Sequence, residues 1–552
     1  MGLADMLRRA GADEPVYLTD VRRAFLSSGG SLLHIHQVLY EGGTERFAIC
    51  LPEWKSAEER DFVKSYLCAE IYNRLCALGA LEMILFCDTG CAEVWELIRQ
   101  LPEIFQTERD LSGRSGYGKC LNVNERILRQ LRGNDAKFRF VFRDLREEPD
   151  VGAAATAFPK AGSAEPDFWR TIPERASRGC RLGIDVGGSD IKFAVAKEGH
   201  LISFLEYDWD PASFREAEEL IRPILSGAEA LLRECGEPDG FDAIGLSFPD
   251  VVIRGRIAGG ETTKTRGIRE HAADYEAEFA AVSGLTELLK GCTKSGVVRC
   301  INDGPMAAFT AALEAASAGG SYENGFFAWS LGTELGTGWV LADGSVPDIP
   351  LEIYNLIIDL GSFGQKKFAP DDIRSTLNLN TGLAGTLQKY TGQSGVFRLA
   401  AKLLPEKNPE LLKRAEEKGL FVREGGRLVV PAAPSDRRKE CLAFFAESTE
   451  EGVPGIFRQI GEYLAVCSRE CRHLLHIETN ERTLFGRLVK NERAAGWILE
   501  GASAGDPDTV WRTAQDGLAA SPLMRELAAD CRHSAAQFGQ AVGAVYYSAC
   551  RT

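Results

Sequence analysis

The feature that most constrains this chain is a glycine pair about a third of the way along its 552 residues. An apolar run ends in Asp185 and leads into Gly187 and Gly188. Ser189 follows, and Lys192 lies in a resumed apolar alternation. The pattern predicts two strands joined by a tight turn, whose glycines let backbone N–H groups approach a phosphate while the carboxylate could hold a hydrated divalent cation. An ordinary hairpin with glycine in its turn explains the same residues equally well.

Length and charge narrow the class of protein. A chain of this length is too long for one hydrophobic core, so several domains are expected. The net charge of −15 and the pI of about 5.2 argue against partners that are nucleic acids or anionic membrane surfaces. The sequence has no run of ~20 apolar residues, and residues 1–15 lack the apolar core of a signal peptide. We therefore expect a cytoplasmic protein.

The fifteen cysteines fit that setting as scattered, reduced thiols. Two pairs, Cys87/Cys91 and Cys467/Cys471, are spaced as on one face of a helix and could together form a four-thiolate zinc site. Neither pair lies among other metal ligands or in a glycine-rich loop. A structural zinc ion is therefore not expected.

The first 150 residues predict a separate α/β domain, because helical and strand periodicities alternate in them. Strands and helices are expected at 47–51, 57–78, 81–87, 91–101 and 138–142. No chemical motif lies in this domain, and its role stays open between oligomerisation, regulation and bracing of an active site. If it folds independently, removal of residues 1–165 should leave the rest of the chain folded.

A second motif joins a strand to a helix. The apolar stretch 297–301 ends in Asn302 and Asp303, and an alanine-rich helix begins around Pro305. A helix N-cap explains this pair most simply. A carboxylate at a strand end beside phosphate loops is also where a general base for a hydroxyl nucleophile would sit.

A third motif is another glycine-rich turn. It follows the apolar stretch 326–329 and contains Gly332, Thr333, Gly336 and Gly338. Such a turn suits a second phosphate-facing hairpin, although many ordinary hairpins also carry glycine.

The three motifs, in this order, resemble the actin-like sugar kinase superfamily. The ROK (repressor, open reading frame, kinase) and bacterial glucokinase group is the best match, with some hexokinase character. ROK first loops resemble Asp-x-Gly-Gly-Thr-x-x-Lys, and here Ser189 stands for the threonine. Their second loops resemble Gly-Thr-Gly-x-Gly, and here Glu334 stands for a glycine. The resemblance covers residues 180–552 and leaves the N-terminal third uncovered.

This resemblance implies a two-lobed actin-like ATPase fold, of the ribonuclease H-like type, preceded by the separate α/β N-terminal domain. A linker rich in Ala, Gly and Pro is expected at 151–178. The first lobe would comprise residues 179–325 and the second residues 326–552. The oligomeric state stays open, a homo-oligomer included.

Roles follow from the matching positions. Asp303 matches the catalytic base that takes the proton from the attacking sugar hydroxyl, and Asn302 matches a sugar ligand. Asp185 matches the residue that holds Mg²⁺ through water. The residues that match the ATP phosphate loops are Asp185, Gly187, Gly188, Ser189, Lys192, Gly332, Thr333 and Gly336.

Other positions are similar to those that lie beside the sugar acceptor in the family. Ser247 lies in a Ser-Phe-Pro-Asp stretch similar to the family's strand end beside the sugar. Thr263 and Lys264 are similar to the Thr-Lys pair with which hexokinases contact sugar, although such pairs are common on surfaces. Glu352 keeps the first position of the family's Glu-x-Gly-His, and Asn355 replaces its histidine. The ROK zinc-binding cysteine cluster and its accompanying sugar-binding acid are absent, so the acceptor's identity stays open.

The implied activity is that of an ATP- and Mg²⁺-dependent kinase acting on a hexose hydroxyl, with glucose 6-phosphorylation as the first expectation. One alternative is a non-catalytic regulator that senses a sugar or nucleotide on the same fold. Another is a kinase for an N-acetylhexosamine or a different small-molecule acceptor. The retained Asp185 and Asp303 favour an enzyme, because a sensor needs no base.

Overall fold

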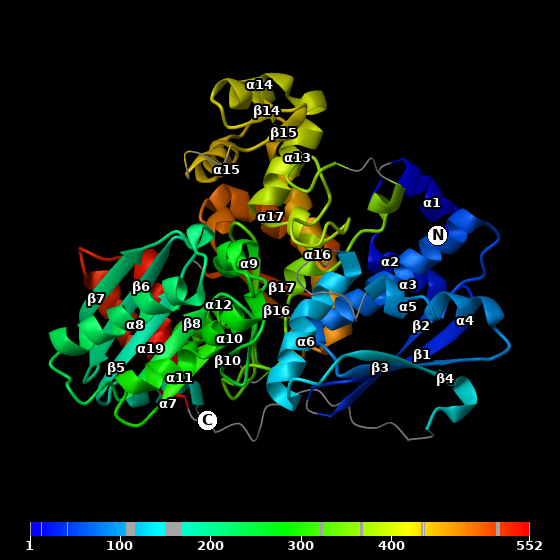
Figure 1. Ribbon diagram of the computed structural model, residues 1–552. Coiled ribbons are helices and arrows are strands. Elements are labelled where there is room, and N and C mark those ends of the chain that lie inside the picture. The colour runs from blue at the N-terminus through cyan, green and yellow to red at the C-terminus, as the bar shows by residue number, and fades with distance from the viewer. Residues whose placement is uncertain are drawn as a thin grey trace.

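The computed structural model describes residues 2–12, 14–40, 42–105, 116–149, 168–320, 324–364, 368–431, 434, 436–514 and 519–550. Within them the chain is a mixed α/β molecule, with several sheets surrounded by many helices (Figure 1). The N-terminal segments lie on one side of the view, the sheet that carries the first glycine turn lies on the other, and a helical cap stands above them.

The N-terminal domain is built on a four-stranded sheet of order β2-β1-β3-β4, in which β3 and β4 are parallel. Strand β1 is missing from the predicted set because His34 and His36 interrupt its apolar pattern. Both rings hydrogen-bond to the Glu148 carboxylate, at 2.7 and 2.9 Å. The helix predicted at 57–78 is confirmed at both ends. The elements are α1 (Leu3–Gly11), α2 (Leu18–Leu26), β1 (Ser31–Val38), β2 (Thr44–Leu51), α3 (Ala57–Leu78), β3 (Glu82–Cys87), α4 (Ala92–Ile98), α5 (Leu101–Phe105), α6 (Lys119–Arg132) and β4 (Arg139–Asp144).

The first lobe holds the predicted glycine turn in a five-stranded sheet of order β11-β8-β5-β6-β7. Strands β5, β8 and β11 are parallel, and β6 is antiparallel to both of its neighbours. The elements are α7 (Phe168–Ala176), β5 (Cys180–Val186), β6 (Asp190–Lys197), β7 (His200–Asp208), α8 (Ala217–Glu234), β8 (Ala243–Phe248), β9 (Val252–Ile253), β10 (Arg256–Ile257), α9 (Arg266–His271), α10 (Tyr275–Ser283), α11 (Leu285–Leu289) and β11 (Val298–Asn302).

The second lobe has a four-stranded sheet of order β13-β12-β16-β17, and its first two strands form the second predicted hairpin. The helical cap of this lobe is formed by the elements at 392–429 and 437–447 (Figure 1). Helix α12 (Asp303–Ser317) follows β11 and belongs to the first lobe. The elements of the second lobe are β12 (Phe326–Leu331), β13 (Leu335–Val340), α13 (Gly392–Lys407), α14 (Pro409–Glu417), β14 (Val422–Glu424), β15 (Arg427–Val429), α15 (Arg437–Glu447), α16 (Val453–Leu475), β16 (Glu481–Phe485), α17 (Glu492–Gly505), β17 (Val510–Thr513), α18 (Pro522–Ala529) and α19 (Ala535–Tyr547).

The last helix, α19, packs on the sheet of the first lobe, where Figure 1 shows it in red among the teal strands. A β-carbon placed at Gly183 or Gly245 would lie 1.9 Å from a carbonyl oxygen of this helix. Helix and strands therefore touch backbone to backbone, which only glycine permits at these two positions. The stretch expected to form the second lobe thus contributes its final helix to the first.

The two lobes meet where α12 crosses β13. A β-carbon at Gly304 would lie 2.3 Å from the carbonyl oxygen of Thr337, and one at Gly338 would lie 2.4 Å from the carbonyl oxygen of Gly304. The start of α12, which carries Asp303, is therefore held directly against the second glycine hairpin.

The N-terminal domain and the second lobe share one hydrophobic core, to which Ile71 of α3 and Leu474 of α16 both belong. The Arg22 guanidinium crosses this boundary, 2.8 Å from Glu70 and 2.9 Å from Glu470. The N-terminal domain is therefore not energetically independent of the rest of the chain.

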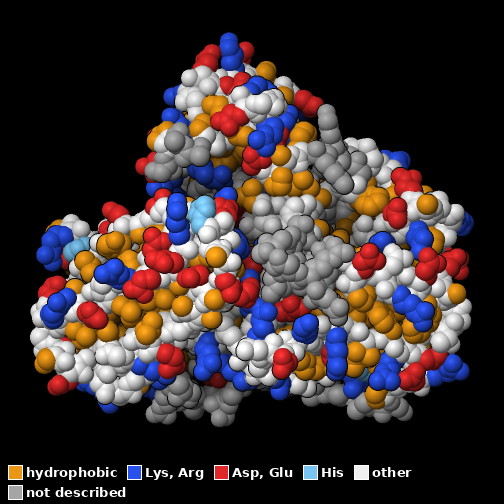
Figure 2. Space-filling view, viewed as in Figure 1, with side chains coloured by type: hydrophobic (Ala, Val, Ile, Leu, Met, Phe, Trp, Pro, Cys, Tyr) orange, Lys and Arg blue, Asp and Glu red, His pale blue; other side chains and the backbone are white. Residues whose placement is uncertain are grey.

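Within the described stretches, none of the helices is both long and apolar enough to cross a bilayer. Acidic and basic side chains are interspersed over the face seen in Figure 2.

Candidate active site

The first glycine turn is the hairpin between β5 and β6 that the sequence predicts. Gly187 donates its N–H to the Asp190 carbonyl at 2.8 Å, and a β-carbon there would lie 2.7 Å from that oxygen. Gly188 and Ser189 are exposed at the tip. Lys192 is paired with Asp190, and its Nζ lies 3.5 Å from Glu206. The tip can therefore receive a phosphate, while the lysine is held by the two neighbouring acids.

Asp185 precedes this turn and is fixed by the next parallel strand. Ser247 of β8 lies opposite it in register and donates its hydroxyl to the carboxylate at 2.9 Å. Burial raises the pKa of Asp185 to about 6, and the Ser247 hydrogen bond opposes this rise, whereas the charge of Asp303 adds to it.

One side chain links the partner of Asp185 to the backbone of Asp303. The Gln540 amide, on α19, donates to the Ser247 hydroxyl and to the Asp303 backbone carbonyl, both at 2.9 Å. The sequence offered no signal for Gln540, because it lies far from the motifs and comes to them only through the packing of α19.

Asn302 and Asp303 occupy the junction of β11 and α12. Asn302 is the N-cap, accepting the N–H of Gly304 at 2.9 Å and donating its amide to the Asp250 carbonyl at 2.8 Å. The simple N-cap interpretation therefore holds for Asn302. The Asp303 carboxylate accepts the same N–H at 3.0 Å. Burial raises the pKa of Asp303, and the Lys264 ammonium opposes that rise.

Lys264 lies between the turn and Asp303. A β-carbon at Gly188 would lie 3.8 Å from its Cε, and its charge acts on the Asp303 carboxylate. The structure thus brings a cation to the place where phosphate and base would meet. Thr263 lies beside it in the short helical turn Thr263–Thr265; its side chain is outside the described part of the chain.

The second glycine turn contacts the helical cap. Gly332 accepts the N–H of Gln393, at the start of α13, at 3.0 Å. Thr333 is exposed. A β-carbon at Gly336 would lie 3.3 Å from the β-carbon of Ser330. Burial raises the pKa of Glu334 to about 7, and the charges of Arg438 and Lys389 oppose the rise. These two cations beside the predicted loop were not indicated by the sequence.

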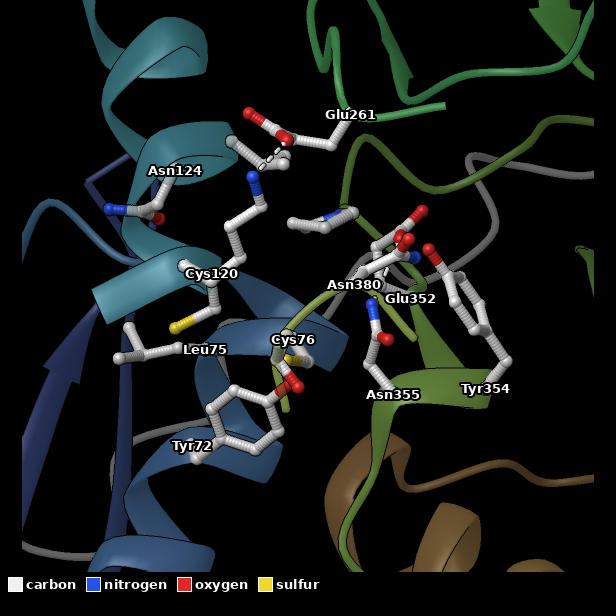
Figure 3. Close-up of a pocket in the computed structure, with 14 residues that line it drawn as sticks. Tyr72, Leu75, Cys76, Cys120, Asn124, Glu261, Glu352, Tyr354, Asn355 and Asn380 are labelled. Carbon is white, nitrogen blue, oxygen red and sulfur yellow. Dashed lines mark hydrogen bonds and ion pairs between the residues drawn. The ribbon is translucent and has the colours of Figure 1, made fainter. Parts of the chain in front are cut away.

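Glu352 and Asn355 line a pocket with Tyr354 (Figure 3). Asn355 donates to the Glu352 carboxylate at 3.3 Å and accepts from Asn378 at 3.1 Å. Burial raises the pKa of Glu352 to about 8, and the charges of Asp250 and Asp303 contribute to this rise. Glu352, which is predicted to bind the acceptor sugar, therefore lies close enough to Asp303, the predicted base, for the charge of Asp303 to raise its pKa.

The opposite wall of this pocket comes from α3 and α6 of the N-terminal domain, a neighbour that sequence motifs did not predict. It includes Leu75, Cys76, Cys120 and Val123. Glu261 lies at the rim (Figure 3), where Lys119 pairs with it at 2.7 Å.

The donor set suits magnesium held largely by water and phosphate. In the described part of the chain, no group of three or more His, Cys, Asp or Glu side chains is placed to share a metal ion. Mg²⁺ at phosphoryl-transfer sites usually keeps several waters and uses one or two carboxylates, a role that Asp185, beside the exposed Gly188 tip, could fill. The described cysteines are free thiols.

Comparison with known proteins gives matches in structure alone. No family model and no curated sequence matches the chain. A ROK family glucokinase from Streptomyces griseus, in complex with glucose and AMPPNP, is 16% identical with a TM-score of 0.41, over 63% of this chain and 98% of that one. A ROK hexokinase from Thermus thermophilus is 19% identical with a TM-score of 0.38, over 63% and 97%.

A third match is a ROK family transcriptional regulator, a homolog of the E. coli MLC protein. It is 12% identical with a TM-score of 0.39, over 67% of this chain and 81% of that one. Each of these three matches is a likeness in structure that covers about two thirds of this chain.

Proposed function

We propose that this protein is a kinase that transfers the γ-phosphoryl group of ATP to a hydroxyl of a hexose, with glucose O6 as the first candidate. The observation that carries the proposal is the chain of hydrogen bonds from Asp185 through Ser247 and Gln540 to Asp303. It connects the Asp185 carboxylate to the backbone of Asp303, and this supports the proposal because phosphoryl transfer depends chiefly on the positioning of such groups.

Asp303 is proposed as the general base. Its carboxylate would accept the proton of the sugar hydroxyl as that oxygen attacks the γ-phosphorus. Its raised pKa suits this role, because a base works best when its pKa approaches the working pH. Asn302 would hold a neighbouring sugar hydroxyl, and Glu352 and Asn355 would bind the far side of the ring.

Asp185 would hold Mg²⁺ through water, and the bound ion would neutralise charge on the transferred phosphoryl group. Lys264, beside the Gly188 turn, would contribute a second positive charge. The backbone N–H groups of Gly188 and Ser189 would contact the phosphates of ATP. The second turn, Gly332–Gly336, with Arg438 and Lys389 nearby, would contact the remainder of the nucleotide's phosphate chain.

The test is a coupled ADP-release assay on the full chain with a panel of hexoses and amino sugars, in the presence of ATP and Mg²⁺. The proposal requires sugar-dependent ADP release that is lost in Asp303→Asn. Sugar binding by calorimetry without ADP release from any acceptor would contradict the kinase and favour the sugar-sensing regulator on the same fold.

A further inference from the structure

The N-terminal domain contacts the segments of the candidate active site at two places. Near the end of helix α3, the carbonyl groups of Ala77 and Cys76 accept the N–H groups of Leu351 and Glu352, at 3.1 and 3.0 Å. Helix α6 makes the other contact, with residues 259–264 of the first lobe. The second contact bears on the phosphate side of the site, because this segment ends in Lys264.

Arg126 of α6 makes the contact with this segment. Its side chain is 3% exposed, and its Nη1 donates to the Gly259 carbonyl at 3.0 Å and to the Glu261 carboxylate at 2.6 Å. Lys119 of α6 pairs with the same carboxylate at 2.7 Å (Figure 3). Burial acts to raise the pKa of Glu261, but the charges of Arg126 and Lys119 outweigh it and lower the pKa to about 2. The carboxylate is therefore ionised at neutral pH, and the contact is an ion pair.

The chain between this ion pair and Lys264 is short and hydrogen-bonded. Only two residues separate Glu261 from Lys264. Just before Glu261, the N–H of Gly260 donates to the buried Asp250 carboxylate at 2.7 Å, and its carbonyl accepts from Arg269 at 3.0 Å. The first lobe thus holds the backbone of the segment, while α6 holds the Glu261 side chain.

Helix α6 is itself fixed to the second lobe. Leu121 and Ile127 of α6 are buried in the hydrophobic core that the N-terminal domain shares with that lobe, where Leu474 of α16 also lies. The same helix extends Arg126 to the first lobe. Arg126 therefore holds a segment of the first lobe at a set place relative to the second lobe, which carries the second glycine turn.

We propose that Arg126 is a positioning residue for phosphoryl transfer, which holds Lys264 between the Gly188 turn and Asp303. The N-terminal domain thereby completes the phosphate side of the active site. Arg126 acts through Lys264 and contacts neither ATP nor the sugar. The proposal rests on the proposed kinase function, and it assigns the N-terminal domain a role that the motifs in the rest of the chain do not require.

The experiment is a double-mutant cycle on the full-length protein, with kcat/KM measured by ADP release. Arg126→Met should lower kcat/KM by about 10–100-fold, because a small misplacement of a catalytic group costs up to about 10²-fold. In a Lys264→Met background the same change should cost less than about 3-fold, because the group that Arg126 positions is already gone. An equal loss in both backgrounds would overturn the proposal, since Arg126 would then act independently of Lys264.

Two matched variants on α6 separate positioning from general loss of charge. Arg126→Lys keeps a cation beside Glu261 and should recover part of the activity, although it lacks the fixed fork of donors. Arg129 pairs with Glu276 at 2.8 Å, as Arg126 also does at 2.6 Å, but in the described part of the chain it makes no hydrogen bond or ion pair with residues 259–264. Arg129→Met should therefore leave kcat/KM unchanged. Equal losses in Arg126→Met and Arg129→Met would contradict a specific hold on this segment.

The contact can also be tested without activity. Amide hydrogen exchange in a peptide that spans residues 259–265 should be faster in Arg126→Met than in the wild type, and unchanged in Arg129→Met. Glu261→Gln removes the same ion pair from the other side and replaces Arg126→Met in both experiments if that variant does not fold. If no sugar supports ADP release, the kinase proposal fails, but faster exchange would still support the hold on Lys264. Unchanged exchange would overturn it, even in an active kinase.

Discussion

The Ser247 hydroxyl donates to the Asp185 carboxylate at 2.9 Å, which links the ends of two neighbouring parallel strands. The carboxyl ends of parallel strands are where ligands gather in open α/β sheets. Because Ser247 also accepts from Gln540, the carboxylate is oriented by a relay that reaches the backbone of Asp303. Activity should therefore depend on residues that never touch the substrate.

Replacing the candidate base gives the most direct prediction. Asp303→Asn keeps the size of the side chain but removes its capacity to accept a proton, so kcat should fall by about 10²–10⁴-fold. Sugar affinity measured by calorimetry should stay within about tenfold of the wild type. Asp239→Asn, at an exposed position, is the matched control. Undiminished turnover in Asp303→Asn would exclude the base assignment.

The raised pKa of Asp185 predicts a pH dependence of magnesium use. A carboxyl with a pKa of about 6 is ionised at about pH 7.5 and largely protonated at about pH 5.5, where it binds a cation poorly. The Mg²⁺ concentration for half-maximal activity should therefore rise as the pH falls through 6. Ser247→Ala removes a hydrogen bond that favours the ionised form, so the rise should begin at higher pH. A half-saturation value independent of pH in both proteins would refute this role.

Lys264 should act on both the phosphate and the base. Lys264→Met removes a positive charge near the Gly188 tip, and kcat/KM should fall by roughly 10²–10³-fold. Because the ammonium opposes the rise in the pKa of Asp303, its loss should also move the acidic limb of the pH–kcat/KM profile to higher pH. Lys264→Arg should restore part of the activity, and Lys290→Met, at an exposed position, should change neither quantity. If the acidic limb lay at the same pH in Lys264→Met and in the wild type, the lysine would not act on Asp303.

Arg22 should matter for stability, because it pairs with two carboxylates that are almost fully buried, Glu70 and Glu470. Arg22→Ala leaves both without their cation and should lower the free energy of unfolding by about 3–5 kcal/mol in urea titrations. The neighbouring Arg23, 74% exposed, provides the control. Its alanine variant should change stability by less than ~0.5 kcal/mol. Equal effects of the two variants would argue against a bridging role.

Deletion of the N-terminal domain tests the shared core. A protein that lacks residues 1–149 would expose the apolar face to which Leu474 belongs and would lose the carbonyl groups that hold Glu352. It should be insoluble or lack the cooperative thermal transition of the full chain. A folded and active truncated protein would instead show that the domain is an independent accessory.

The sequence correctly predicted the elements that depend on local sequence pattern. The hairpin turns at Gly187 and Gly332, the helix at 57–78 and the junction at Asn302 are all set by periodicity, glycine or capping within a few residues. It could not predict contacts between distant segments. Gln540 reaches Ser247, and α3 reaches Glu352, only after the whole chain has folded, and neither contact leaves a periodic signal.

The docking of α19 on the first sheet has a consequence for protein synthesis. The ribosome completes β11 roughly 230 residues before it begins α19, an interval of roughly 10–50 s at 5–20 residues per second. Throughout that interval the backbone faces at Gly183 and Gly245 have no covering helix. The nascent first lobe therefore lacks one covering helix until synthesis is nearly complete, and a chain that terminated before residue 535 would leave this face of its sheet permanently uncovered.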